Sequence, residues 1–320
     1  MRFIPRMVAD AGVPPSDLIA SRAPMARPRI ATALVVYKKS AWEQHLAKKG
    51  GRIRDAETRR SLLRSHRENL AAIEAVKKAL ESAKIRFRVT SRTDLHPARP
   101  GNEPDLFVSV GGDGTFLETS HQVRRGRILG VNSSPEHSVG FFCAATRQSF
   151  ARVLARALDG ELPAILLHRL EVRLRGRILP HLALNDVLVT PTNPGATARY
   201  TLRVGRVKEP HRSSGVWIST AAGSTAGIRA AGGALLPLAS DRMQWAVREL
   251  YVPPGEKKPK LRKGVLPRDT EIRVVSTMLD GAIFVDGPRH RYPLSLGDEV
   301  WVRVSRAPLA ALGLDAARGR

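Results

Sequence analysis

The sequence predicts two domains: an α/β domain built on a doubly wound parallel sheet, followed by a largely antiparallel β domain. Two observations lead to this prediction. In the first part of the chain, apolar strand-like runs alternate with helical patterns, which is typical of a parallel sheet covered by helices. After Pro163, short alternating stretches are separated by turn residues, which is typical of antiparallel strands. A chain of 320 residues is long enough for two hydrophobic cores.

The expected elements of the first domain follow one another regularly. Strands are expected at 30–37, 85–89, 106–110 and 127–132, with helices at 56–83 and 115–125. The run 106–110 (Leu-Phe-Val-Ser-Val) is apolar on both faces, as in a strand inside a parallel sheet. This order predicts a Rossmann-like sheet with its functional site at the carboxyl ends of the strands.

Domain boundaries follow from this change of pattern. We expect the α/β domain at 29–145 and a β-rich, substrate-binding domain at 146–305, with a linking helix at 147–158. Strands of the second domain are expected at 170–174, 183–189, 199–204, 215–220, 271–275, 282–285 and 300–304. Residues 1–28 are expected to be a disordered or extraneous arm. Residues 306–320 are expected to be a tail that could pack back on the first domain.

Charge and cysteine content limit the class of protein. The net charge is +24, which attracts polyanions. Aromatic residues make up only 5%, with no stretch in which they interleave with basic ones, so nucleic-acid binding is expected to be only adventitious. The single cysteine, Cys143, excludes an intrachain disulfide and a Cys-based zinc site, and agrees with a cytoplasmic location. No segment has the apolar length of a membrane span.

The nine histidines show no metal-binding spacing, and no metal ligand is assigned. We expect His168, His181 and His211 to be surface residues or strand residues with satisfied hydrogen bonds.

The segment Gly-Gly-Asp-Gly-Thr at 111–115 directly follows the strand expected at 106–110. Its glycines permit positive φ and a close approach of a ligand to the backbone. Thr115 and Glu118 have the spacing of a capping box, which predicts a helix start suited to phosphate. A carboxylate among such donors, here Asp113, suggests a group that takes a proton or holds a magnesium ion during phosphoryl transfer. The alternative is a plain turn that ends the strand.

Three segments of the second half are also candidates. Asn185-Asp186 lies in an apolar frame, and an amide beside a carboxylate can hold ribose hydroxyls and an adenine edge, although a bulge or turn is the common alternative. Residues 223–227 follow an expected strand and predict a helix that runs to Gly232-Gly233, which tight helix–sheet packing would also explain. Asp280-Gly281 and Asp286-Gly287 bracket a strand, as in a hairpin.

Together these segments resemble the NAD kinase family, within the superfamily that includes diacylglycerol and sphingosine kinases. The resemblance extends from about residue 30 to 305 and rests on segments 111–115, 129–132, 183–187, 223–226 and 285–287, in this order. The stretches 129–140 and 212–215 are most similar to the mitochondrial-type branch of the family.

The resemblance implies a Mg²⁺-dependent transfer of the γ-phosphate of ATP to the 2′-hydroxyl of the adenosine ribose of NAD, giving NADP. Asp113 would be the general base, as a ribose hydroxyl needs a proton acceptor. The residues that would bind nucleotide or substrate are Gly111, Gly112, Gly114, Thr115, Asn132, Asn185, Asp186, Ser224, Thr225 and Ala226. The resemblance also implies a homo-oligomer, dimer or tetramer.

The chain departs from the family pattern at several positions. Thr220-Ala221-Ala222 stands where the family commonly has Thr-Pro-Thr, and Pro288 stands where glutamine commonly follows Asp-Gly. These departures leave open a lipid or sugar-phosphate kinase of the same superfamily, and a non-catalytic basic protein that binds nucleotides or nucleic acid. NADH as acceptor and polyphosphate as donor also stay open.

Gly227 stands where relatives have an aromatic residue. Without a ring, the site must bind its dinucleotide more weakly or use another ring, for which Phe116, Trp217 and Tyr251 are candidates. The first alternative predicts that Gly227→Tyr lowers the KM for NAD.

Overall fold

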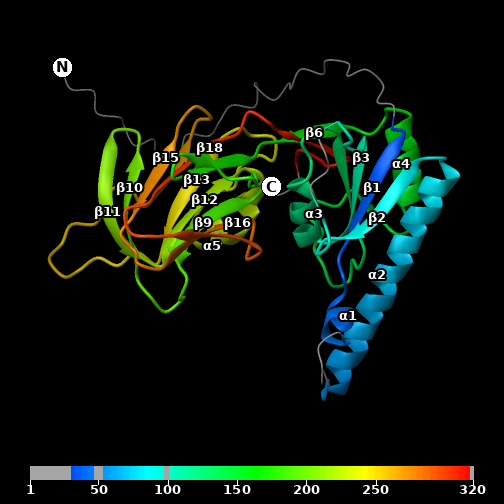
Figure 1. Cartoon of the computed structure of the whole chain (residues 1–320), viewed down its shortest axis with the longest axis horizontal. Helices are drawn as coiled ribbons and strands as arrows, with labels where there is room; N and C mark the ends of the chain where they lie inside the picture. The colour runs from blue at the N-terminus through cyan, green and yellow to red at the C-terminus, as the bar shows by residue number, and fades with distance from the viewer. Residues whose placement is uncertain (1–29, 47–52, 97–100, 318–320) are drawn as a thin grey trace.

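The computed structural model describes residues 30–46, 53–96 and 101–317, which form two domains side by side (Figure 1). The arm expected at 1–28 lies outside these residues. None of the helices within the described ranges has both the length and the apolar character required to cross a membrane.

The first domain contains a mixed sheet that is mostly parallel. Its strand order is β2-β1-β3-β4-β19-β6, with β5 paired to β4, and β6 is antiparallel to β19. The bounds are β1 (Thr32–Tyr37), β2 (Arg86–Ser91), β3 (Leu106–Gly111), β4 (Arg127–Asn132), β5 (Ala145–Thr146), β6 (Ala164–Leu167) and β19 (Leu309–Leu312). All six residues of the central strand β3 are buried, as its apolar sequence predicts.

Helices cover both faces of this sheet. They are α1 (Ala41–Leu46), α2 (Ala56–Ser82), α3 (Asp113–Ser120) and α4 (Phe150–Leu158). Helix α2 begins after Asp55, whose side chain accepts a hydrogen bond from Thr58 N at 2.6 Å, a standard N-cap. Its apolar stripe packs with α4 on one face of the sheet, whereas α3 covers the other face.

The boundary expected at 145 differs from the structure. Helix α4, expected to link the domains, buries Phe150, Leu154 and Ala157 in the core that contains the α2 stripe. Strand β6 then joins the first sheet, and β19 returns to it near the end of the chain. The α/β domain therefore extends to residue 167 and includes 309–312, because these apolar segments complete its core.

The second domain is a sandwich of two antiparallel six-stranded sheets, with orders β11-β10-β15-β18-β7-β8 and β14-β13-β12-β9-β16-β17. The apolar faces of both sheets form one core. Their strands are β7 (Leu170–Leu174), β8 (Arg177–Ile178), β9 (Asp186–Pro191), β10 (Ala198–Val204), β11 (Val207–Ser213), β12 (Gly215–Thr220), β13 (Met243–Arg248), β14 (Lys263–Leu266), β15 (Ile272–Ser276), β16 (Gly281–Val285), β17 (His290–Leu294) and β18 (Glu299–Val304). The predicted fold class, α/β followed by antiparallel β, is confirmed.

Candidate functional site

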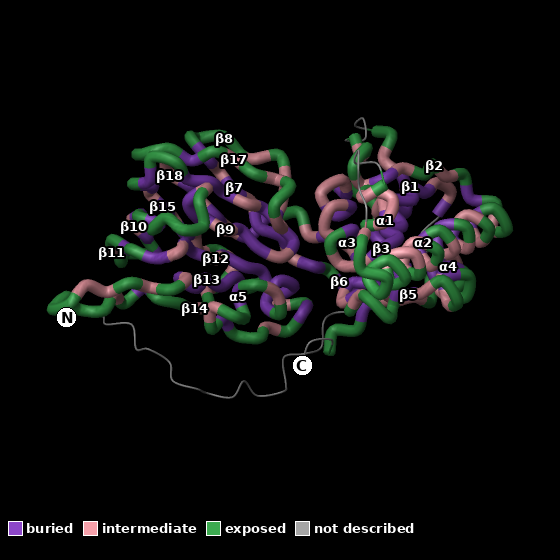
Figure 2. The backbone as a smooth tube through the Cα atoms, turned by 90° about the horizontal axis from the view of Figure 1, so that it is seen from below, coloured by how far each residue is buried: buried purple, intermediate pink, exposed green. Residues whose placement is uncertain are grey.

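Helix α3 lies on the side of the first domain that faces the second, in both views of the molecule (Figures 1 and 2). Phe116 of α3 belongs to a buried apolar cluster that also contains Leu184, Ala222 and Leu238 of the second domain. Helix α3 is therefore part of the domain interface, and the chain segments on either side of it lie close to the second domain.

The turn from β3 into α3 needs glycine because other atoms come close to its backbone. A Cβ on Gly111 would lie 2.3 Å from Thr115 Oγ1, and a Cβ on Gly112 would lie 2.3 Å from Ser138 Oγ. Neither of these glycines, nor Gly114, has the positive φ that the sequence analysis considered. Glycine is needed at positions 111 and 112 only because a larger side chain would not fit.

The start of α3 also differs from the sequence expectation. The helix begins at Asp113 with Gly112 as its N-cap, whereas the capping-box spacing placed the start at Thr115. The Glu118 side chain does not cap the helix, because it points across the interface to the second domain. Thr115 Oγ1 is buried and has no hydrogen-bond partner among the described residues, so it can serve a ligand.

The Asp113 carboxylate is held by one backbone group. Its Oδ1 accepts a hydrogen bond from Phe142 N at 2.9 Å. Within the described part of the chain, Oδ2 accepts none, and the residue is half-buried. One oxygen is thus fixed by the protein while the other is available, which is the arrangement that a general base or a metal-bound carboxylate requires.

Asn132 at the end of β4 organises the loop that covers this turn. Its Nδ2 donates to Ser138 O at 2.9 Å, and its Oδ1 accepts from Ser134 N at 3.1 Å. Gly140 has a φ of +61°, and a Cβ there would lie 2.4 Å from Asn132 Nδ2. Because Ser138 also packs on Gly112, the Asn132 amide positions the loop against the glycine turn.

Asp286 holds the backbone of the Asn185-Asp186 segment. Its carboxylate accepts hydrogen bonds from the backbone N–H groups of Leu184 (2.7 Å), Asn185 (2.7 Å) and Asp186 (3.0 Å). The Asp286 side chain is fully buried. It stands in the turn after β16, where Asp286 and Gly287 both have positive φ, as the Asp-Gly hairpin signal predicts. Asn185 Oδ1 is buried without a partner among the described residues, so it can accept a bond from a ligand.

Burial changes the ionisation of both carboxyl groups. Burial, together with the neighbouring charge of Asp286, raises the pKa of Asp186 to about 8. Burial also raises the pKa of Asp286 to about 6, although the hydrogen bonds from three backbone N–H groups act to lower it. Near neutral pH, Asp286 is therefore ionised and Asp186 is protonated. A protonated Asp186 can donate a hydrogen bond, which an ionised carboxylate cannot.

The small-residue segment 223–226 packs directly on Asn185. A Cβ on Gly223 would lie 2.1 Å from Asn185 O, so only glycine fits there. Ser224 is buried, and its Oγ accepts from Leu236 N at 3.2 Å, which gives it a structural role. Thr225 is exposed and Ala226 half-buried. Of the four residues, Gly223 is the one in direct contact with the predicted nucleotide-binding pair.

The single helix expected from this segment to Gly232-Gly233 is not present. The chain forms a 3₁₀ turn, η2 (Ala222–Thr225), and then a short helix, α5 (Gly227–Ala230). The extended backbone of Ala226 (φ −89°, ψ −150°) interrupts the helical hydrogen bonds between them. The run of small residues allows this break because no side chain has to be accommodated.

Two side chains of α3 contact the hairpin formed by β16 and β17. Glu118 Oε1 lies 3.1 Å from His290 Nε2, and Oε2 lies 3.8 Å from Arg289 Nε. At the end of the helix, His121 Nε2 lies 3.5 Å from Asp286 Oδ2, and both side chains are buried. The helix that begins with the predicted base is thus connected through Asp286 to the predicted nucleotide-binding pair.

The histidines at this interface pack together. Ring centroids are 4.5 Å apart for His121 and His290, and 3.8 Å apart for His181 and His290. Burial, together with the charges of the other two histidines, holds the pKa of His121 well below its usual range, so this ring is neutral near pH 7. His181 is half-buried and bonded to Tyr292, and His211 bonds two backbone carbonyls. No group of three metal-binding side chains occurs in the described ranges.

Two residues of this site, Arg92 and His121, were not predicted from the sequence, and neither was the role of Asp286. Arg92 is half-buried, and its Nη1 lies 3.5 Å from where a Cβ on Gly114 would be, so a cation adjoins the glycine turn. In the sequence, Asp286 was marked by its Asp-Gly turn signal and by segment 285–287 of the family resemblance, but neither showed what its carboxylate binds. Nothing near Arg92 or His121 marks them, because their partners are distant in the chain.

Trp217 occupies the space beside Gly227. A Cβ on Gly227 would lie 3.0 to 3.4 Å from three atoms of the indole ring. Arg248 lies over the same ring, 5.7 Å from its centroid. The Trp217 indole therefore already occupies the space beside Gly227, so a side chain at position 227 has little room.

Comparison with known proteins adds independent findings. The search found no family model that matches the chain. The chain is 34% identical to a probable NADH kinase of Oryza sativa subsp. japonica over 77% of its own length and 80% of that protein. It is 32% identical to an NADH kinase of Arabidopsis thaliana, over 74% of this chain and 81% of that protein. It is 30% identical to an NAD kinase of Aquifex aeolicus, over 75% of this chain and 86% of that protein.

Two solved structures share the fold. One is an NAD kinase from Archaeoglobus fulgidus in complex with ATP, with a TM-score of 0.63 at 22% identity, covering 89% of this chain and 94% of that one. The other is yeast NADH kinase complexed with NADH, with a TM-score of 0.67 at 17% identity, covering 91% and 86%. The resemblance found in the sequence is thereby confirmed: this chain belongs to the NAD kinase family and is a kinase.

Proposed function

We propose that this kinase transfers the γ-phosphate of ATP to the 2′-hydroxyl of the adenosine ribose of NAD, producing NADP. The observation that carries the proposal is the Asp113 carboxylate, with one oxygen fixed by Phe142 N and the other available. It begins the helix whose other end reaches Asp286, which in turn holds Asn185 and Asp186. One helix thus carries the proton acceptor at its start and, at its end, lies against the carboxylate that holds the nucleotide-binding pair.

The roles of the residues follow from this arrangement. Asp113 takes the proton of the ribose hydroxyl, which is a poor nucleophile until a positioned base accepts it. Thr115 Oγ1 and Asn185 Oδ1, both buried without partners among the described residues, bind and orient the substrates. The glycine turn, Ser224, Thr225, Ala226 and the loop held by Asn132 shape the site around them. Correct positioning supplies most of the catalysis in phosphoryl transfer.

Mg²⁺ fits this donor set as a companion of ATP. The described residues offer no cluster of three metal ligands, whereas magnesium usually keeps several waters and binds through one or two carboxylates together with substrate phosphates. Asp113 is the carboxylate at the glycine turn that could contribute. When bound, the ion would neutralise charge on the transferring phosphoryl group.

Steady-state rates with Mg-ATP and a panel of acceptors test the proposed function. The panel contains NAD, NADH, sphingosine and sugar phosphates, with polyphosphate as a second donor. We expect the highest kcat/KM with NAD. NADH is the first alternative, because two plant relatives are named NADH kinases and both forms share the reacting ribose. A preference for sphingosine or a sugar phosphate would contradict the proposal.

Asp186 gives the protein a testable pH dependence. Its pKa of about 8 in the folded state lies above its ordinary value of 3.8, so folding favours the protonated form. The associated stability is present below about pH 4 and is lost as pH rises toward 8. Asp186→Asn removes this dependence. Denaturant unfolding from about pH 5 to about pH 9 should show wild type losing stability relative to the variant; parallel curves would contradict the assignment.

Arg92 is expected to stabilise phosphate at the glycine turn. Arg92→Gln removes the cation but keeps most of the side-chain volume, so we expect the KM for ATP to rise and kcat to fall by about tenfold or more, with little effect on the KM for NAD. Arg88→Gln, which replaces an exposed arginine of β2, the strand that ends directly before Arg92, is the matched control. Equal effects of the two substitutions on ATP kinetics would assign Arg92 a merely structural role.

Gly227→Tyr is expected to raise the KM for NAD, which revises the expectation from the sequence. The new side chain must displace the Trp217 ring, whose nearest atom lies 3.0 Å from the added Cβ. The double variant with Trp217→Leu should recover part of the loss, because the two side chains compete for one space. A lower KM in the single variant would show that the indole does not limit this space.

We further propose a cytoplasmic homo-oligomer, dimer or tetramer. The outer face of the β9 sheet carries a half-exposed apolar row in which Phe284, Leu188 and Trp217 stand directly opposite one another on adjacent strands. Sedimentation or light scattering of the purified chain measures the subunit number, and Leu188→Glu should reduce it. A monomeric wild type would contradict the proposal.

A further inference from the structure

The outer face of the other sheet of the sandwich carries a row of basic residues with a tryptophan among them. Lys208, Arg203, Arg273, Trp301 and Arg173 stand directly opposite one another on strands β11, β10, β15, β18 and β7. The inner residues of the same strands form the sandwich core, so these side chains point away from it. We call these five residues the cationic row.

The cationic row is costly for the fold. Like charges directly opposite each other on adjacent strands destabilise a sheet. The repulsion on Arg273 is partly offset, because its guanidinium lies 3.1 Å from the centre of the Trp301 ring and 4.0 Å from Glu271. Lys208, Arg203 and Arg173 form no ion pair with any described residue. The row thus keeps charge that the protein itself does not neutralise.

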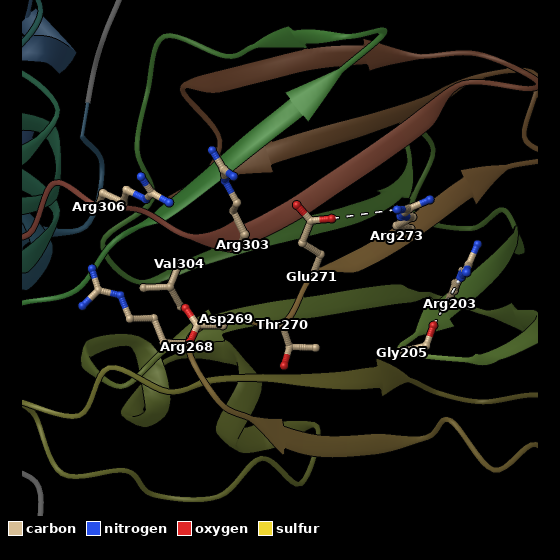
Figure 3. Close-up of a pocket in the computed structure, with 10 residues that line it drawn as sticks. All are labelled: Arg203, Gly205, Arg268, Asp269, Thr270, Glu271, Arg273, Arg303, Val304 and Arg306. Atoms are coloured by element: carbon tan, nitrogen blue, oxygen red, sulfur yellow. Dashed lines mark hydrogen bonds and ion pairs between the residues drawn. The ribbon is translucent and has the colours of Figure 1, made fainter.

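A groove adjoins the cationic row. It has a volume of about 880 Å³ and is lined by Arg203, Gly205, Arg268, Asp269, Thr270, Glu271, Arg273, Arg303, Val304 and Arg306. Arginines outnumber acids in this lining. Figure 3 shows Arg203 and Arg273 toward one end, with Arg268 and Arg306 toward the other. Arg303 is neutralised by Glu171 at 2.7 Å, whereas Arg268 and Arg306 form no ion pair with described residues.

We propose that the cationic row and its groove bind single-stranded nucleic acid. The phosphates would follow the row, which spans about 19 Å at the usual strand spacing. The stacked Arg273 and Trp301 side chains offer a flat platform, and both guanidinium and indole planes stack bases. This site shares no residue with the candidate kinase site, and the inference does not depend on the proposed function.

The chemistry of the row favours a single strand over other polyanions. An open sheet face with charge around an aromatic group suits a chain whose bases are free to stack. Inorganic polyphosphate has no base for Trp301, and a duplex hides its bases in the stack. The sequence predicts only adventitious nucleic-acid binding because its aromatic and basic residues do not alternate within any one stretch. The cationic row instead combines residues from five strands that lie between residues 170 and 304.

Fluorescence anisotropy of a labelled oligonucleotide of about 12 nucleotides tests the charge contribution. The double variant Lys208→Gln/Arg203→Gln should raise the Kd about tenfold and lower the salt slope, d log K/d log[salt], by about 1.4 in magnitude. The matched control is Lys258→Gln/Arg262→Gln, which removes the same two charge types from exposed positions in the 257–263 cluster. Equal losses in the two variants would show binding by net charge alone and would overturn the proposal.

Trp301→Leu tests the identity of the ligand. We expect it to weaken oligonucleotide binding about 5-fold to 150-fold, the loss of one stacked base, while competition by inorganic polyphosphate stays unchanged. Wild-type protein that binds polyphosphate or duplex as tightly as the single strand would overturn the assignment. Thermal unfolding checks that each variant is folded, and wild-type acceptor kinetics in all variants would separate this site from the kinase site.

Discussion

Replacing Asp113 by asparagine is expected to lower kcat by about 10²- to 10⁴-fold, the usual contribution of a general base, while the protein stays folded. The substitution keeps the shape of the side chain. The amide oxygen can still accept the bond from Phe142 N, but the group can no longer take a proton. Because Asp113 is half-buried at a helix start and forms no ion pair with described residues, little stability should be lost.

Three measurements on the Asp113→Asn variant separate loss of the base from loss of structure. Calorimetric binding of NAD and the midpoint of thermal unfolding should both stay close to wild type, and single-turnover rates should show that the chemical step is slow. A variant with wild-type kcat would refute the assignment of the base. A variant that no longer binds nucleotide would instead assign Asp113 to substrate binding.

Asp286→Asn is expected to have the second largest effect. The buried carboxylate accepts three backbone N–H bonds, and an amide in its place must point its own N–H₂ group at one of these donors. Leaving buried donors unsatisfied costs about 1–3 kcal/mol each, so the free energy of unfolding should fall by about 3 kcal/mol. The KM for NAD should rise as well, because Asn185 and Asp186 lose the group that fixes their backbone.

Asp280→Asn is the matched control for this experiment. Asp280 also belongs to an Asp-Gly pair beside β16, but it is exposed. Among the described residues its carboxylate accepts a hydrogen bond from Thr192 Oγ1 alone, and its backbone carbonyl accepts one from Thr192 N. We expect its effects on stability and on KM to be within about 0.5 kcal/mol of zero. If denaturant unfolding gave the two variants the same loss, the three-donor account of Asp286 would be wrong.

Local pattern was enough to predict much of the fold. A pattern within a single element records which of its sides faces the core. Examples are the apolar run of β3, the helical spacing of α2 and the alternation of β10. The strand β13 was not predicted, although Met243, Trp245 and Val247 alternate toward the core. Short strands such as β6 and β19 are defined by the sheet they join, which local sequence does not indicate.

The candidate site was predictable only in part, for the same reason. Segments with their own signature, such as the glycine turn at 111–114 and the Asn185-Asp186 pair, can be found one at a time. The contacts that join them cannot, since Asp286 lies about 100 residues from the backbone it holds and His290 lies 172 residues from Glu118. The helix start was misplaced because the carboxylate of Glu118 is used across the interface and not as a cap.

The most direct test of the central claim is the identity of the phosphorylated product. Purified protein is incubated with Mg-ATP and NAD, and ³¹P NMR follows the new phosphomonoester. The account predicts a single product with its phosphate on the 2′-oxygen of the adenosine ribose, absent in the Asp113→Asn variant. A phosphate on any other oxygen, or ATP consumed without a new phosphomonoester of NAD, would contradict it.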